Sequence, residues 1–139
     1  MSDIFALQGK SNCGKTETIN EVFVELQRKY STASATLFTP NKIDVKAIID
    51  IPIGGKIVKV GIESQGDPNS RLQASLIDFD NAGCDIIICA CRTSGMTVNW
   101  INSYSHSYQI QFIQQSWVPN NSQASNRAMA LNIISLAGL

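Results

Sequence analysis

The feature that most constrains how this chain can fold is an octapeptide near its start, Gly9-Lys10-Ser11-Asn12-Cys13-Gly14-Lys15-Thr16. It fits the pattern G-x-x-x-x-G-K-[ST] at every fixed position. The apolar run 4–7 before it can form a short buried strand. After it, apolar residues recur at the spacing of one helix face, namely Ile19, Val22, Phe23, Leu26 and Tyr30. The chain is therefore predicted to begin with a strand, a glycine-containing loop and a helix over about 14–30.

This order of elements suits the binding of a phosphate group. The N–H groups of the loop and of the helix N-terminus present partial positive charge to an anion. Lys15 would add a full charge near the β- and γ-phosphates, and the Thr16 hydroxyl is placed to hold Mg²⁺. All eight residues are therefore candidate nucleotide-binding residues. The alternative is a glycine-rich turn that only caps the helix.

Length and charge set the broad class. A chain of 139 residues forms one domain, 1–139. Its 11 basic and 11 acidic residues balance, which argues against nucleic acid as the main partner. No apolar stretch approaches the ~20 residues of a membrane span, and Asp3 ahead of a short apolar run does not resemble a signal peptide. We expect a cytoplasmic protein without a membrane partner.

The four cysteines, Cys13, Cys84, Cys89 and Cys91, form no C-x-x-C pair and have no histidine cluster beside them. Buried thiols in a reducing compartment are the better interpretation. Cys13 differs because it lies inside the loop. A helix N-terminus favours a thiolate there, so we expect sensitivity to oxidation or alkylation.

The rest of the chain alternates between strand and helix patterns. Gly54 and Gly55 can form a tight connection, so an antiparallel hairpin is plausible within 45–62. Strands are expected at 35–39, 45–51, 56–62, 85–91 and 108–113, and helices at 68–80, 97–105 and 124–137.

Glu63 directly follows the apolar run 57–62. With the octapeptide and the alternating element order, it makes the chain resemble the P-loop NTPase superfamily, although the sequence match is specific only at the loop. The resemblance implies an α/β, three-layer P-loop NTPase fold, whose mostly parallel sheet of five or six strands has helices on both faces. It also implies Mg-nucleotide at the carboxyl edge of the sheet and phosphoryl transfer or hydrolysis as the activity.

Within that resemblance the turn after Glu63 is the second candidate site. Glu63 would be the carboxylate that holds Mg²⁺ with Thr16, and Asp67 is the alternative. Gln65 would orient water, and Glu63-x-x-Gly66 resembles the D-x-x-G switch of GTPases with Glu in place of Asp. The competing interpretation is a polar turn in which Asp67 caps a helix that starts at Pro68.

Arginines and asparagines supply the remaining candidates. Arg92 follows the most apolar strand and would stabilise charge on the phosphates, or form a structural ion pair. Arg71 and Arg127 are further candidates for phosphate contacts. Three asparagines after the last strand could contact the base, or serve as turn residues: Asn120, Asn121 and Asn126.

The tetrapeptide Asn41-Lys42-Ile43-Asp44 spells N-K-x-D, which reads guanine in GTPases. There the motif follows the fourth core strand, whereas here it precedes the third. The misplacement favours ATP over GTP.

We therefore expect an ATP-binding protein, either a Mg-dependent ATPase or a nucleotide-controlled switch stimulated by a protein partner. A small-molecule or nucleotide kinase is one alternative, although no Arg-rich lid is evident between residues 87 and 108. A nucleotide-binding interaction module with little turnover is the other. In the favoured mechanism Lys15, Glu63, Gln65 and Arg92 carry the chemistry.

Overall fold

The computed structural model of the chain describes residues 2–10, 13–38, 44–115 and 122–139. Its strands are β1 (Ser2–Gln8), β2 (Ser34–Leu37), β3 (Lys46–Ile53), β4 (Lys56–Glu63), β5 (Ile86–Cys91) and β6 (Tyr108–Gln114). Its helices are α1 (Lys15–Lys29), α2 (Leu72–Asn81), α3 (Met96–Asn102) and α4 (Ser122–Leu136). None of the helices in these described ranges is long and apolar enough to cross a bilayer.

The six strands form one sheet in the order β2-β3-β4-β5-β1-β6. From β4 to β6 neighbouring strands are parallel, whereas β2, β3 and β4 pair antiparallel. The prediction of a mostly parallel P-loop NTPase fold is therefore wrong, because the first part of the sheet is an antiparallel ladder.

The short connections between β2, β3 and β4 explain why these strands pair antiparallel. A parallel pair needs a crossover of about a dozen residues or more. Only residues 38–45 connect β2 to β3, and Gly54 and Gly55 alone connect β3 to β4. Both glycines have positive φ, 57° and 79°, as a two-residue hairpin turn of type I′ requires. The predicted hairpin within 45–62 is thus present.

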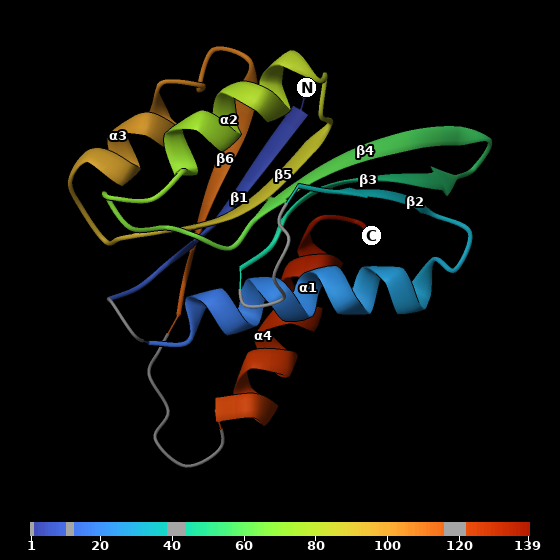
Figure 1. Cartoon of the computed structure of the whole chain (residues 1–139), viewed down its shortest axis with the longest axis horizontal. Coiled ribbons are helices and arrows are strands. Elements are labelled where there is room, and N and C mark those ends of the chain that lie inside the picture. The colour runs from blue at the N-terminus through green and yellow to red at the C-terminus, as the bar shows by residue number, and fades with distance from the viewer. Residues whose placement is uncertain (1, 11–12, 39–43, 116–121) are drawn as a thin grey trace.

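Helices cover both faces of the sheet (Figure 1). On one face α1 and α4 bury the apolar side chains of alternate strand positions, among them Leu7, Ile62 and Ile88. On the other face, α2 and α3 cover a second cluster that includes Ile4, Ile87 and Phe79. Strand β5 is buried on both faces, as its apolar run predicts.

Two differences from the predicted elements affect the site. Strand β5 lies between β1 and β4, so Glu63 is not on the strand next to the loop strand. Helix α2 begins at Leu72 rather than Pro68, with Arg71 at its N-cap. Asp67 therefore does not cap α2. Its carbonyl instead accepts the Ser70 N–H and hydroxyl in a separate turn.

Candidate functional site

The loop between β1 and α1 holds its own lysine. The Lys15 ammonium donates to the carbonyl oxygens of Gly9, at 2.5 Å, and Lys10, at 3.2 Å. Lys15 is only 6% exposed. Burial lowers the pKa of its ammonium, an effect that nearby Arg92 reinforces and that Cys13 and Asp67 oppose. A desolvated cation with two neutral acceptors is a local source of positive potential.

The start of α1 adds to this potential. Gly14 occupies the N-cap with φ of 99°, and among the residues that the structure describes no side chain caps the helix. The first N–H groups of an uncapped helix lack intrahelical partners. A Cβ on Gly14 would also lie 2.9 Å from Oδ1 of Asn126. Glycine is therefore required here both by its backbone conformation and by the close approach of Asn126.

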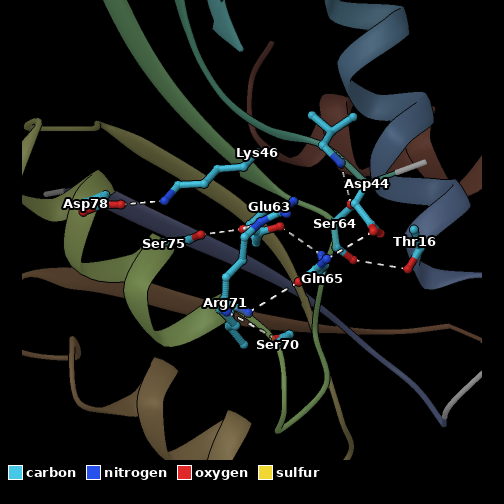
Figure 2. A network of polar contacts seen from close by, with 12 residues as sticks. Thr16, Asp44, Lys46, Glu63, Ser64, Gln65, Ser70, Arg71, Ser75 and Asp78 are labelled. Atoms are coloured by element: carbon cyan, nitrogen blue, oxygen red, sulfur yellow. Dashed lines mark hydrogen bonds and ion pairs between the residues drawn. The ribbon is translucent and has the colours of Figure 1, made fainter. Parts of the chain in front are cut away.

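Glu63 is fully buried, and α2 engages its carboxylate (Figure 2). Oε1 accepts hydrogen bonds from the Ser75 hydroxyl and from Nε of Arg71, the latter at 2.7 Å, while Oε2 accepts the Gln65 N–H at 3.0 Å. These donors compensate a charge that would be costly alone. Both predicted residues Glu63 and Arg71 therefore meet, but as an ion pair that anchors α2 to β4.

The residues after Glu63 connect the loop to a neighbouring segment. The Thr16 hydroxyl donates to the Ser64 carbonyl at 3.3 Å, and the Ser64 hydroxyl accepts the Val45 N–H at 2.8 Å. The Gln65 amide donates to Asp44 at 3.1 Å (Figure 2). In this state Gln65, predicted to orient water, is bonded to Asp44 and to the Arg71 backbone.

Gly66 passes directly over β5. A Cβ there would lie 2.5 Å from the Ala90 carbonyl oxygen and 2.7 Å from the Cys91 nitrogen. No side chain can occupy that space, so the glycine is a packing requirement of the turn. This reason is independent of the resemblance of Glu63-x-x-Gly66 to a GTPase switch.

Asp67 and Arg92 form the third part of the site. Nε of Arg92 lies 2.8 Å from Oδ1 of Asp67, and both charges act on the Lys15 ammonium. The Arg92 N–H donates to the buried Thr97 hydroxyl at 3.1 Å, which fixes the backbone where β5 ends. Asp67, predicted as the alternative metal ligand to Glu63, is thus a carboxylate whose charge acts on the Lys15 ammonium.

A polar cluster that the sequence did not reveal lies beneath the loop. Gln115, which follows β6, donates through its amide to the Cys13 carbonyl at 3.4 Å and to Oδ1 of Asn126 at 3.2 Å. The Thr18 hydroxyl donates to the same oxygen at 3.1 Å. Asn126 thus lies in α4 against α1, which is not the position expected of a base-contacting loop residue. Gln115 carries no motif, and only its place one residue after a strand hinted at a role.

Other predicted residues lie elsewhere. Arg127 is 3.4 Å from Glu25 on α1, away from the loop. Four of the predicted loop and base contacts fall outside the described residues: Ser11, Asn12, Asn120 and Asn121. Most of the N-K-x-D tetrapeptide also lies outside them.

No protein-family model, curated protein or solved structure matches this chain. The function is therefore argued from the residues of the site itself.

The oxygen atoms near Thr16 fit Mg²⁺. This ion prefers oxygen ligands and keeps several waters, so one or two protein oxygens and substrate phosphates suffice. The Thr16 hydroxyl and the Ser64 carbonyl are hydrogen-bonded to each other, so their two oxygen atoms lie side by side. Within the described ranges no three His, Cys, Asp or Glu side chains gather as a metal cage. The role of Glu63 in holding Mg²⁺ stays a prediction, since three donors already engage its carboxylate.

Proposed function

We propose that this chain binds the triphosphate of a nucleotide at Gly9–Thr16, with Mg²⁺ as counter-ion. The observation that carries the proposal is the Lys15 ammonium, buried at the uncapped start of α1 with neutral carbonyls as its partners. Burying an unpaired charge is costly. A phosphate would compensate this charge, accept hydrogen bonds from N–H groups of the first turn of α1, and displace Lys15 from the loop carbonyls.

ATP is the proposed nucleotide. The guanine-reading tetrapeptide is misplaced in the sequence, and its Asp44 bonds Gln65 beside β4. We propose the cytoplasm as location because all four cysteines are free. When bound, Mg²⁺ would neutralise charge on the β- and γ-phosphate oxygens, and the Thr16 hydroxyl and the Ser64 carbonyl are the protein groups that would hold it.

We further propose a nucleotide-controlled switch with slow intrinsic hydrolysis. Hydrolysis adds water to the γ-phosphorus, breaks its bond to ADP and releases a proton. The groups predicted to assist, Glu63 and Gln65, are engaged by Arg71, Ser75 and Asp44. Both side chains must leave these partners before they can orient an attacking water molecule. A protein partner that stabilises the rearranged state would stimulate turnover.

The test compares thermal unfolding with ATP, GTP and ADP, each with and without Mg²⁺. Wild type should be stabilised most by Mg-ATP, because ligand that binds only the folded state raises its stability. Lys15→Met should abolish this shift. Lys56→Met is the matched control, because Lys56 is an exposed lysine at the opposite end of β4. An equal shift in Lys15→Met and wild type would exclude the loop as the site.

Phosphate release then separates the switch from a fast hydrolase. Isolated wild type should release phosphate slowly while binding ATP fully. Turnover on the order of 10 s⁻¹, typical of an efficient enzyme, would contradict the switch. Binding without any turnover would favour the nucleotide-binding module.

A further inference from the structure

The cluster beneath the loop joins three elements that are distant in sequence. Thr18 comes from α1, Gln115 follows β6, and Asn126 belongs to α4. Thr18 is fully buried and Asn126 is 7% exposed. Buried polar groups are retained when their hydrogen bonds are satisfied. Asparagine is also a weak helix former, so its place inside α4 is explained by these bonds.

The hydrogen-bond donors of Gln115 and Thr18 determine how the three side chains of the cluster are oriented. The Gln115 amide has two N–H donors, and they reach the Cys13 carbonyl and Oδ1 of Asn126. The Thr18 hydroxyl has one proton, and its shorter contact, 3.1 Å, is with the second lone pair of Oδ1 of Asn126. The oxygen of Asn126 thus receives two donors. Gly14 makes room for it.

The cluster therefore fixes the turn that precedes Lys15. The Cys13 carbonyl accepts a hydrogen bond from the Gln115 amide, and Gly14 is packed against Asn126. The Gly14 carbonyl accepts the Thr18 N–H at 3.0 Å. None of these contacts requires a ligand. A loop already held in shape loses less conformational freedom when an anion binds.

We propose that Thr18, Gln115 and Asn126 are positioning residues that hold the Cys13–Gly14 turn ready for phosphate. The proposal rests on the proposed function for its ligand. It differs from the predicted role of Asn126, since a base-contacting asparagine affects only ligands that carry a base. A positioning residue affects every ligand that enters through its phosphates.

The first experiment needs no ligand and uses the Cys13 thiol, 7% exposed, as a probe of the turn. Iodoacetamide labelling of each cysteine is followed by peptide mass spectrometry. In Thr18→Val, which removes the hydroxyl and keeps the shape, Cys13 should label about fivefold faster, the effect of one lost hydrogen bond. Thr18→Ser should restore the wild-type rate, and Thr36→Val, on exposed β2, should not change it.

The other thiols control for global opening. Cys84, Cys89 and Cys91 are buried, and burial raises the pKa of the Cys84 and Cys91 thiols to about 12. They should stay unlabelled in every variant. An unchanged Cys13 rate, or a parallel rise at all four cysteines, would overturn the proposal.

The second experiment measures the affinity of Thr18→Val and Asn126→Ala for ATP and for inorganic triphosphate by calorimetry. Both ligands should weaken by the same factor, with Asn132→Ala, exposed on α4, as the control. Loss of ATP binding alone would overturn positioning in favour of base contact. If wild type binds neither ligand, the proposed function fails, and the labelling rates still decide whether the cluster holds the turn.

Discussion

Nε of Arg92 lies 2.8 Å from Oδ1 of Asp67, and this pair joins the segments that follow β4 and β5, close enough to Lys15 for both charges to act on it. Two opposite charges therefore face the same loop and neutralise each other. Both side chains are partly exposed, so the pair contributes no more than about 1 kcal/mol. Such a pair can exchange partners. A phosphate would attract Arg92, and Asp67 would be released toward the metal ion.

If Arg92 exchanges Asp67 for a phosphate, Asp67→Asn should bind ATP more tightly than wild type when Mg²⁺ is absent. The variant removes a repulsive charge and frees Arg92, and about 1 kcal/mol corresponds to roughly fivefold in affinity. Calorimetry with ATP in EDTA measures it. Asp80→Asn, the same charge change at the far end of α2, serves as control. Weaker binding of Asp67→Asn in EDTA would contradict the exchange.

The contacts of Glu63 predict a large effect on stability from its partner. Arg71→Met leaves a fully buried carboxylate without its cation. We expect a loss of about 3 kcal/mol in urea unfolding, the low end for a buried pair because water reaches part of Arg71.

Glu63→Gln should cost less than Arg71→Met, and the double variant should resemble Glu63→Gln. Arg127→Met removes a largely exposed guanidinium from the buried Glu25 while Arg28 still pairs with that carboxylate, so stability should change by less than about 1 kcal/mol. Equal losses in Arg71→Met and Arg127→Met would mean that Glu63 is not a desolvated charge.

A third prediction concerns two glycines that are required for different reasons. Gly66→Ala would force a methyl group into the backbone of β5, at Ala90 and Cys91. We expect a loss of about 2–3 kcal/mol from overpacking. Gly83→Ala meets open space but has φ of 75°, so its cost should be about 1–2 kcal/mol from backbone conformation alone. Guanidinium unfolding of both variants tests the order.

Local patterns predicted most single elements. The octapeptide, the helix face after it and the apolar run of β5 are each readable within about a dozen residues, because periodicity reflects burial directly. The hairpin of β3 and β4 was predicted from its glycines, whereas the antiparallel pairing of β2 with β3 was not, although the short connection that dictates it is visible in the sequence. The resemblance to a parallel fold implied the opposite direction for β2.

The site was harder to predict because its partners are remote. The Thr18 hydroxyl and Asn126 are 108 positions apart, and neither belongs to the motif. Glu63 is recognisable in the sequence as the carboxylate that ends an apolar run, and its predicted role at a metal ion stays a prediction. Its partner Ser75 could not be identified, because that contact depends on where α2 begins. Side-chain partners follow from packing, which periodicity does not encode.

The last prediction is a pH dependence that isolates Lys15. Burial lowers the pKa of its ammonium in the folded state below 10.5, so the unfolded chain holds this proton more tightly. Between the folded and unfolded pKa values, unfolding takes up a proton, and the Lys15 contribution to stability therefore rises with pH. Below the folded pKa the charged, desolvated ammonium opposes folding.

Ligand-free Lys15→Met should accordingly be at least as stable as wild type at pH 7, and this advantage should shrink as the pH approaches 10.5. Buried thiols and Tyr108 have pKa values that burial raises to about 12 in the folded state, but they ionise within the same pH range once the chain unfolds. Only the difference between the two unfolding curves, measured by urea titration from pH 7 to 10.5, reports Lys15. A difference that does not change with pH would show that the ammonium is solvated. In the proposed function a bound phosphate would offset the cost of burying this cation.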